Sequence, residues 1–155
     1  MPLDPPVPDP AEGTADDGDE VAVLAANAAY YEAFEARDLE AMSDAWEHGD
    51  RVSCTHPGWQ TLRGWGAVAG SWFALFQGPQ HLQFVLTSTH VEVVGDVAWV
   101  TVDENLLDSG GQAPGAGEGD AAVGGTVAAL NLFVRSADGR WRLVAHHGAP
   151  VARRG

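Results

Sequence analysis

The chain has 155 residues, of which 45% are hydrophobic and 19% are charged, and this composition is typical of one globular domain. Its apolar runs span only a few residues, far short of the roughly 20 needed to cross a bilayer, so no membrane partner is expected. The formal net charge is −14, from 22 acidic and 8 basic residues. Such a chain repels phosphate backbones, which makes nucleic acid a poor partner.

The N-terminal segment differs in composition from the rest of the chain. It has neither the basic nor the apolar stretch of a secretory signal, and the single cysteine, Cys54, cannot form an internal disulfide, so we expect a cytoplasmic protein. Residues 1–18 are rich in proline and acidic side chains and bury too little apolar surface to become ordered. We therefore predict a disordered acidic tail over 1–18 and a folded domain over 19–151.

Three helices are predicted in the first half of the chain. The first extends from Asp19 to Asp38, and Asp38 caps a second, shorter helix. A third helix follows the Pro57–Gly58 turn and ends at Gly78. The predicted buried stripes are Val21, Leu24, Ala28, Tyr31 and Phe34 in the first helix, Leu39, Met42, Ala45 and Trp46 in the second, and Val68, Trp72, Leu75 and Phe76 in the third.

The second half of the chain is predicted to form strands. A short strand over 52–56 precedes four long ones, predicted over 81–94, 97–108, 121–135 and 141–149. The first two long strands form a hairpin around Gly95–Asp96, and the glycine-rich stretch 109–120 is predicted to be a flexible loop. Helices followed by antiparallel hairpins indicate an α+β fold, and a long twisted sheet tends to curl around the helices packed on it.

Both faces of the predicted strands are apolar. Within 91–94 and 97–102, large hydrophobic residues occupy both sets of alternating positions, so the face turned away from the helices is also expected to be covered. A second copy of the chain is the simplest cover. We therefore predict a homodimer that forms through the outer face of the sheet.

The order of elements and several local motifs resemble the SnoaL-like branch of the nuclear-transport-factor-2-like superfamily. The resemblance covers about residues 20–151, and the last segment below is also similar to the association domain of calcium/calmodulin-dependent kinase II. It implies a cone, in which a curved antiparallel sheet holds three N-terminal helices on its concave face around an apolar-lined cavity. The segments that carry the resemblance are Tyr31–Met42, Cys54–Trp59, Gly64–Trp72 and Asp138–His147, with Pro150 soon after.

The resemblance leaves the activity open. The superfamily includes isomerases, cyclases, epoxide hydrolases and dehydratases beside binding and assembly modules, so it implies a pocket for a small apolar molecule. One interpretation is a general acid/base isomerase, cyclase or hydrolase, and the other is a non-catalytic dimeric ligand-binding or assembly module. We find no counterpart of the ketosteroid isomerase arrangement of a tyrosine with a protonated aspartic acid, because Tyr30 and Tyr31 lie on the first helix.

Three residues are candidates for acid/base catalysis. His147 matches the family's paired-histidine position and shares a face with Trp141 when counted with a period of two. Glu104 follows Asp103 in an apolar strand, and alternation turns one of the two inward. The resemblance favours Glu104, and a carboxyl group inside an apolar cone has a raised pKa. His56 ends the short strand at the rim, and histidine titrates near neutral pH. The alternatives are local hydrogen bonds for both histidines and a solvated position for Glu104.

Three further residues are candidates for ligand binding. Trp59 follows the turn at the rim, Trp72 belongs to a helix that closes the cone, and Asn131 interrupts an apolar strand where its amide would hold a ligand carbonyl. The alternatives are core packing for the tryptophans and a hydrogen bond within the sheet for Asn131. No metal site and no cofactor are expected, because metal-binding motifs are absent. A nucleophilic pair of Cys54 and His56 is not expected either, because strand neighbours point apart.

Overall fold

The computed structural model describes residues 17–108 and 124–152. Within these residues, three helices and six strands form the α+β architecture that the sequence predicts. The predicted loop 109–120 lies outside them, as does the predicted tail except for its last two residues, which belong to the first helix. The elements are α1 (Asp17–Ala36), α2 (Leu39–Ala45), β1 (Ser53–Thr55), β2 (Leu62–Arg63), α3 (Trp65–Gln77), β3 (Leu82–Val94), β4 (Val97–Asp108), β5 (Gly125–Arg135) and β6 (Trp141–Pro150).

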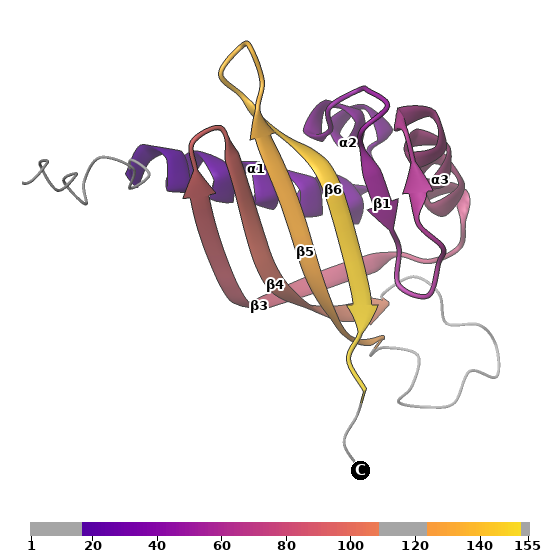
Figure 1. Ribbon diagram of the computed structural model, residues 1–155. Coiled ribbons are helices and arrows are strands. Elements are labelled where there is room, and N and C mark those ends of the chain that lie inside the picture. The colour runs from indigo at the N-terminus through magenta and orange to yellow at the C-terminus, as the bar shows by residue number, and fades with distance from the viewer. Residues whose placement is uncertain (1–16, 109–123, 153–155) are drawn as a thin grey trace, which may run out of the picture.

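One open, mixed sheet contains all six strands of the described residues, in the order β2-β1-β6-β5-β4-β3. The four long strands form the predicted antiparallel meander, and β1 joins it parallel to β6. The sequence does not predict β2, a two-residue strand that pairs with β1. Figure 1 shows the long strands crossing in front of α1, with α2 and α3 gathered beside β1. None of the described helices is long and apolar enough to cross a bilayer.

The face that α1 turns toward the sheet matches the predicted one at Tyr31 and Phe34 and differs from it in the first half of the helix. Asn27, Tyr30 and Tyr31 are buried in the interior. Val21 and Leu24, which the sequence pattern predicts there, are exposed. Because alanines occupy so many positions of this helix, several apolar stripes are available, and packing selects one that brings polar side chains inward. The interior of the protein therefore receives an amide and two phenolic hydroxyl groups from α1.

A bulge in β6 changes which side chains face the interior. The register between β5 and β6 shifts there, and Val144 is the extra residue. An extra residue inverts the alternation of all positions that follow it. His146 is consequently 3% exposed, and His147 lies exposed on the outer face. The predicted orientation of His147 is wrong, because a period-two count from Trp141 assumes an unbroken ladder.

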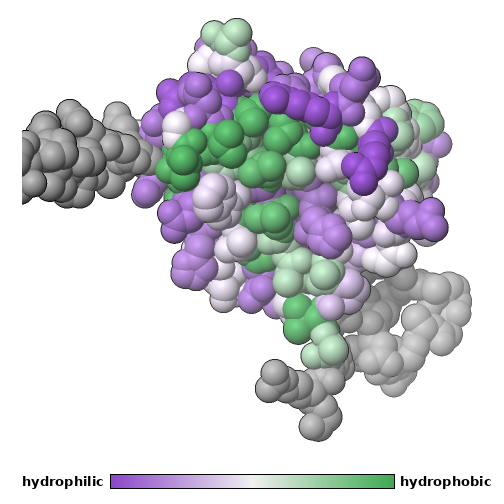
Figure 2. Space-filling view, viewed as in Figure 1, coloured by the Kyte–Doolittle hydropathy of each residue, from purple (hydrophilic) through white to green (hydrophobic). Residues whose placement is uncertain are grey.

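The outer face of the sheet carries large hydrophobic side chains. Figure 2 shows them over the long strands. Val94 is 61% exposed and Leu130 is 43% exposed, although both are aliphatic. Trp99 and Leu132 lie opposite each other on β4 and β5 of this face. The sheet is thus apolar on both sides, as the strand pattern predicts.

Asp38 connects the first two helices. Its backbone N–H donates to the Ala33 carbonyl at the end of α1, and its carboxylate accepts a hydrogen bond of 3.0 Å from the backbone N–H of Ala41 in α2. Only the second bond depends on the side chain. It is the N-terminal cap of α2 that the sequence predicts.

Replacement of Asp38 by alanine should lower the free energy of unfolding by about 1 kcal/mol, because the N–H group of Ala41 loses its acceptor. Urea unfolding followed by tryptophan fluorescence measures the change. Glu40→Ala, at an exposed position of the same helix, is the matched control and should cost less than about 0.5 kcal/mol. Equal losses in the two variants would contradict the capping role.

Candidate functional site

Polar side chains gather between α1 and the inner face of the sheet, and we call this group the interior cluster. Every member is at most 6% exposed. Burying so many polar groups costs free energy, so such a cluster indicates a site more strongly than core packing does. Its members are Asn27, Tyr30 and Tyr31 from α1, Cys54 from β1, His56 just after β1, Ser71 from α3, Glu104 from β4, Asn131 from β5 and His146 from β6.

Glu104 is the acid of the interior cluster. The structure places it on the inner face of β4, where the Tyr31 hydroxyl donates to Glu104 Oε2 at 2.6 Å. Burial raises the pKa of Glu104 to about 7, although the hydrogen bond from Tyr31 lowers it. Burial and the nearby Glu104 charge raise the pKa of Tyr31 far above its usual value, so this phenol keeps its proton. At neutral pH, Glu104 can therefore gain or lose a proton while Tyr31 remains a donor.

Asn131 connects this pair to His146. Its amide nitrogen donates to Asn27 Oδ1 at 2.9 Å and to Tyr31 Oη at 3.1 Å, and its carbonyl oxygen lies 2.5 Å from His146 Nδ1. Burial lowers the pKa of His146 to about 3, so the imidazole is neutral. Since an amide oxygen only accepts, Nδ1 carries the proton and Nε2 carries the lone pair. Asn131 therefore orients its neighbours, and its amide is not free to hold a ligand as predicted.

His56 forms a second arm of the interior cluster. Its Nε2 lies 2.9 Å from Ser71 Oγ, and the Ser71 hydroxyl donates its one proton to the Val68 carbonyl at 2.6 Å. Ser71 Oγ must then accept from His56, so Nε2 carries the imidazole proton and Nδ1 the lone pair. Burial lowers the pKa of His56 to about 4, which keeps this imidazole neutral as well.

Cys54 and His56 are in contact, contrary to the expectation from the sequence. Their side chains share one face because they are two residues apart, and Cys54 Sγ lies 3.7 Å from His56 Nε2. Burial raises the pKa of the Cys54 thiol to about 12, so the pair is neutral and holds no thiolate nucleophile. Among residues 17–108 and 124–152, no three His, Cys, Asp or Glu side chains gather where they could hold a metal ion.

The two tryptophans predicted to bind ligand both contact His56. Gly58 has a positive φ of 82°, and the Trp59 N–H donates to the His56 carbonyl at 2.8 Å, as in a type II turn. This turn holds the Trp59 ring 4.8 Å from the imidazole and 45% exposed. The Trp72 ring lies 4.8 Å from the same imidazole but is buried. Trp59 thus lies half-exposed on a surface turn, and Trp72 belongs to the core.

His147, the remaining predicted catalytic residue, takes no part in the interior cluster. It pairs with Leu130 on the outer face of the sheet, and the bulge puts His146 inside instead. Sequence reasoning also missed the contribution of α1. Its signal is present in the spacing of Asn27, Tyr30 and Tyr31, which are three and four residues apart and therefore lie on one helical face.

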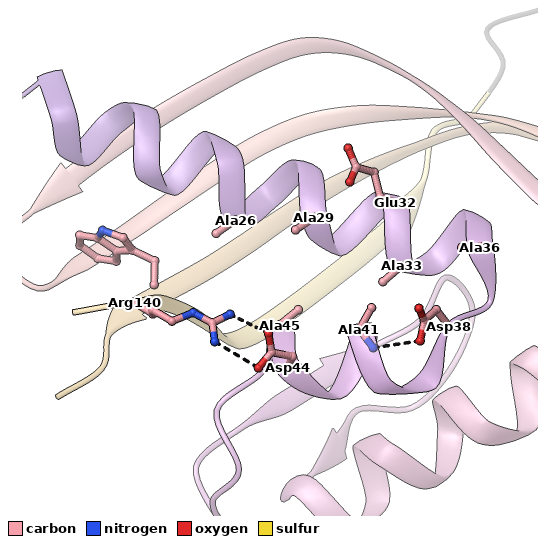
Figure 3. A pocket seen from close by; sticks show the side chains of 11 residues that line it. Ala26, Ala29, Glu32, Ala33, Ala36, Asp38, Ala41, Asp44, Ala45 and Arg140 are labelled. Carbon is pink, nitrogen blue, oxygen red and sulfur yellow. Dashed lines mark hydrogen bonds and ion pairs between the residues drawn. The ribbon is translucent and has the colours of Figure 1, made fainter. Parts of the chain in front are cut away.

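A surface hollow of about 330 Å³ lies between α1, α2 and the start of β6. Figure 3 shows that its walls are mostly alanine side chains. Arg140, its basic residue, is paired with Asp44 at 2.7 Å. This hollow offers little for chemistry, and the interior cluster is the stronger candidate site.

The raised pKa of Glu104 makes the stability of the protein depend on pH. In the folded state the group keeps its proton up to about pH 7, whereas its usual pKa is 4.5. Between these values the unfolded state binds fewer protons than the folded state, so stability falls as the pH rises. The loss is complete above pH 7 and amounts to about 3 kcal/mol.

Glu104→Gln should remove this pH dependence. The free energy of unfolding of the variant minus that of the parent should increase by about 3 kcal/mol from pH 4 to pH 8. Urea unfolding at each pH measures it, and the contributions of His56 and His146 cancel in the comparison. Glu92→Gln, at an exposed position of β3, is the control. Parallel curves for Glu104→Gln and the parent would contradict a buried acid.

Two solved structures of known proteins have a fold similar to this one. A candidate dehydratase of the NTF2-like family from Streptomyces avermitilis is 41% identical, covers 88% of this chain and 99% of its own, and superposes with a TM-score of 0.76. A candidate calcium/calmodulin-dependent protein kinase type II association domain from Thiobacillus denitrificans is 34% identical, covers 83% of this chain and 94% of its own, and has a TM-score of 0.67.

Among curated proteins, the F-box protein SKIP8 of Arabidopsis thaliana is 27% identical over 128 residues. The match covers 83% of this chain and 49% of the plant protein, so the chain spans about half the length of that relative. A family model of the SnoaL-like domain matches residues 23–153. The match extends over most of the chain and agrees with the architecture of helices on a curved sheet, so the protein belongs to the family of SnoaL-like domains, with an NTF2-like fold.

Proposed function

We propose that the protein is an enzyme that moves protons on a small apolar substrate held inside the cone. The observation that supports this most directly is the buried Glu104 carboxyl group, whose pKa is raised to about 7. A group with a pKa near the working pH serves as both acid and base. Tyr31 stays protonated beside it, at 2.6 Å, as a fixed donor.

The chemistry of the interior cluster favours proton transfer over nucleophilic attack. His56 and His146 are neutral and each presents one lone pair, while Glu104 supplies or takes up a proton. An isomerase, a cyclase and a hydrolase all need such a combination of acid and base. The 41% identity to a candidate dehydratase favours the elimination of water, which also removes one proton and protonates a leaving hydroxyl group.

The aromatic residues around His56 suit the proposed substrate. Trp72 provides an apolar wall, and the half-exposed Trp59 lies on a turn at the rim. We propose that the substrate enters past Trp59. A cytoplasmic location is part of the proposal, because Cys54 is a buried free thiol that fits a reducing compartment.

Hydrogen–deuterium exchange tests this activity. The protein should accelerate the exchange of α-protons of small ketones in D₂O, followed by proton NMR, and the rate should rise to a plateau above about pH 7 as Glu104 ionises. Glu104→Gln should lower the rate by about 100-fold or more. His146→Ala should lower it as well, whereas the matched variant His147→Ala, on the outer face, should not. Exchange that persists in Glu104→Gln would contradict the proposal.

The second candidate is a non-catalytic ligand-binding or assembly module. The observation that favours it is the 34% identity to a candidate kinase association domain. Such a module would bind ligands inside the cone without exchanging their protons. The exchange experiment therefore separates the two functions.

We also propose that two copies of the chain associate through the outer face of the sheet. Stable interfaces have an apolar centre and bury about 800 Å² on each partner. The outer face offers such a centre in Val94, Trp99 and Leu130, which lie on the side opposite the helices.

Leu130→Arg should convert a dimer into a monomer of 16.3 kDa, because it would bury an unpaired charge in the interface. Sedimentation velocity measures the mass. Val21→Arg, at an exposed position of α1, is the control and should leave the dimer intact. A parent protein that sediments as a monomer at micromolar concentration would overturn the proposed dimer.

A further inference from the structure

The outer face of the sheet carries two histidines that the proposed mechanism does not use. His90 of β3 and His147 of β6 are both exposed. The strand registers place them in one row across the sheet. His147 lies opposite Leu130 of β5, and Thr101 of β4 lies on the other side of Leu130. His90 lies opposite Thr101, so the row begins and ends with an imidazole.

This row lies within the face that we propose as the interface between two copies. Trp99 belongs to the next row on one side, and Asp103 to the next row on the other. Neighbouring strands are about 4.8 Å apart, so the two imidazoles, which are three strands apart, are separated by about 14 Å. A partner that buries about 800 Å² covers a disc of about 16 Å radius. An interface centred on Leu130 and Thr101 therefore covers both histidines.

Two acidic side chains lie beside the histidines on this face. Glu92 of β3 is two residues from His90 and exposed. Asp103 of β4 is two residues from Thr101 and half-buried. Residues that are two apart in a strand point to the same side of the sheet. Each copy of the chain therefore brings two carboxylates to the interface.

The arginines of the described strands are either paired already or distant from these carboxylates. The Arg142 guanidinium of β6 is paired with Asp138 at 2.9 Å, and Arg135 of β5 is paired with an acid of α1 on the inner side of the sheet. Arg63 belongs to β2, which lies two strands beyond β6 at the edge of the sheet. Among the described residues of this face, His90 and His147 are then the groups that can supply positive charge as the pH falls.

Association changes the cost of leaving these carboxylates without a positive partner. Burial of an unpaired charge is unfavourable, and two copies bring four carboxylates together. Histidine changes its charge between pH 8 and pH 5, and the four imidazolium groups of a dimer equal the four carboxylates in number. The formal net charge of −14 acts in the same direction, because protonation reduces the repulsion between two acidic copies.

We propose that two copies of the chain take up protons when they associate through the outer face, and that His90 and His147 bind these protons. The dimer is therefore tighter at pH 6 than at pH 8. The inference rests on the proposed dimer and adds its regulation, since acidification favours the dimer and alkaline pH favours the monomer. Glu92 and Asp103 are the carboxylates that the protonated histidines neutralise.

Sedimentation velocity with fluorescence detection tests the proposal on the full chain, from nanomolar to micromolar concentration, at pH 6, 7 and 8 and constant ionic strength. The Kd of the dimer should fall at least about tenfold from pH 8 to pH 6. The double variant His90→Gln, His147→Gln should lose most of this change, because glutamine is polar but does not take up a proton. His48→Gln is the matched control, since it removes an exposed histidine outside the sheet, and it should keep the full change.

Glu92→Gln tests the role of the carboxylates. The variant brings one unpaired charge fewer per copy to the interface, so its dimer should be tighter than that of the parent at pH 8. Its Kd should also change less between pH 8 and pH 6. Circular dichroism verifies that each variant is folded.

Three results would overturn the inference: a Kd that stays within about twofold between pH 6 and pH 8, a dimer that is weaker at pH 6, or a pH dependence that persists in the double histidine variant. Failure of the proposed dimer is distinguishable from these results. A parent protein that stays monomeric at every pH removes both the dimer and its regulation, whereas a dimer with a constant Kd removes only the regulation.

Discussion

The hydrogen bond from Tyr31 to Glu104 links α1 to the middle of the sheet, and the other polar contacts of the interior are arranged around it. On α1, Asn27 and Tyr30 lie inward beside Tyr31, whereas the apolar side chains of Val21 and Leu24 are exposed. Two opposing effects meet at Glu104, because burial favours the protonated acid and the phenol favours the carboxylate. Their balance leaves the acid close to its titration midpoint at neutral pH. More complete burial would raise the pKa of Glu104 further, and exposure to solvent would lower it.

The remaining polar groups are held by directional pairing rather than by charge. Asn131 uses both amide protons and its carbonyl oxygen on three different side chains, and Ser71 decides the tautomer of His56 by donating elsewhere. Each imidazole therefore has a defined lone pair while staying uncharged. A protein with a formal charge of −14 thus keeps an interior in which Glu104 is the group that changes charge near neutral pH.

The parts of this fold that the sequence predicts are those with local causes. The Gly95–Asp96 turn and the cap at Asp38 depend on a few neighbouring residues. Alternation along β4 predicts that either Asp103 or Glu104 faces inward, and the resemblance to the family favours Glu104. The sequence pattern does not determine which side of α1 faces the sheet, because alanine fits on either side of a helix. The position of His146 depends on a register shift between two strands, which no pattern within β6 alone reveals.

The adjacent histidines of β6 give this bulge a further consequence. A strand that gains or loses one residue normally exchanges its inward side chains for unrelated ones, and an internal site would be lost in that single step. Here the neighbouring position holds the same side chain. If β6 paired with β5 without the bulge, His147 would turn inward, opposite Ala129. The two adjacent histidines therefore keep one imidazole on the inner face of the sheet in either register.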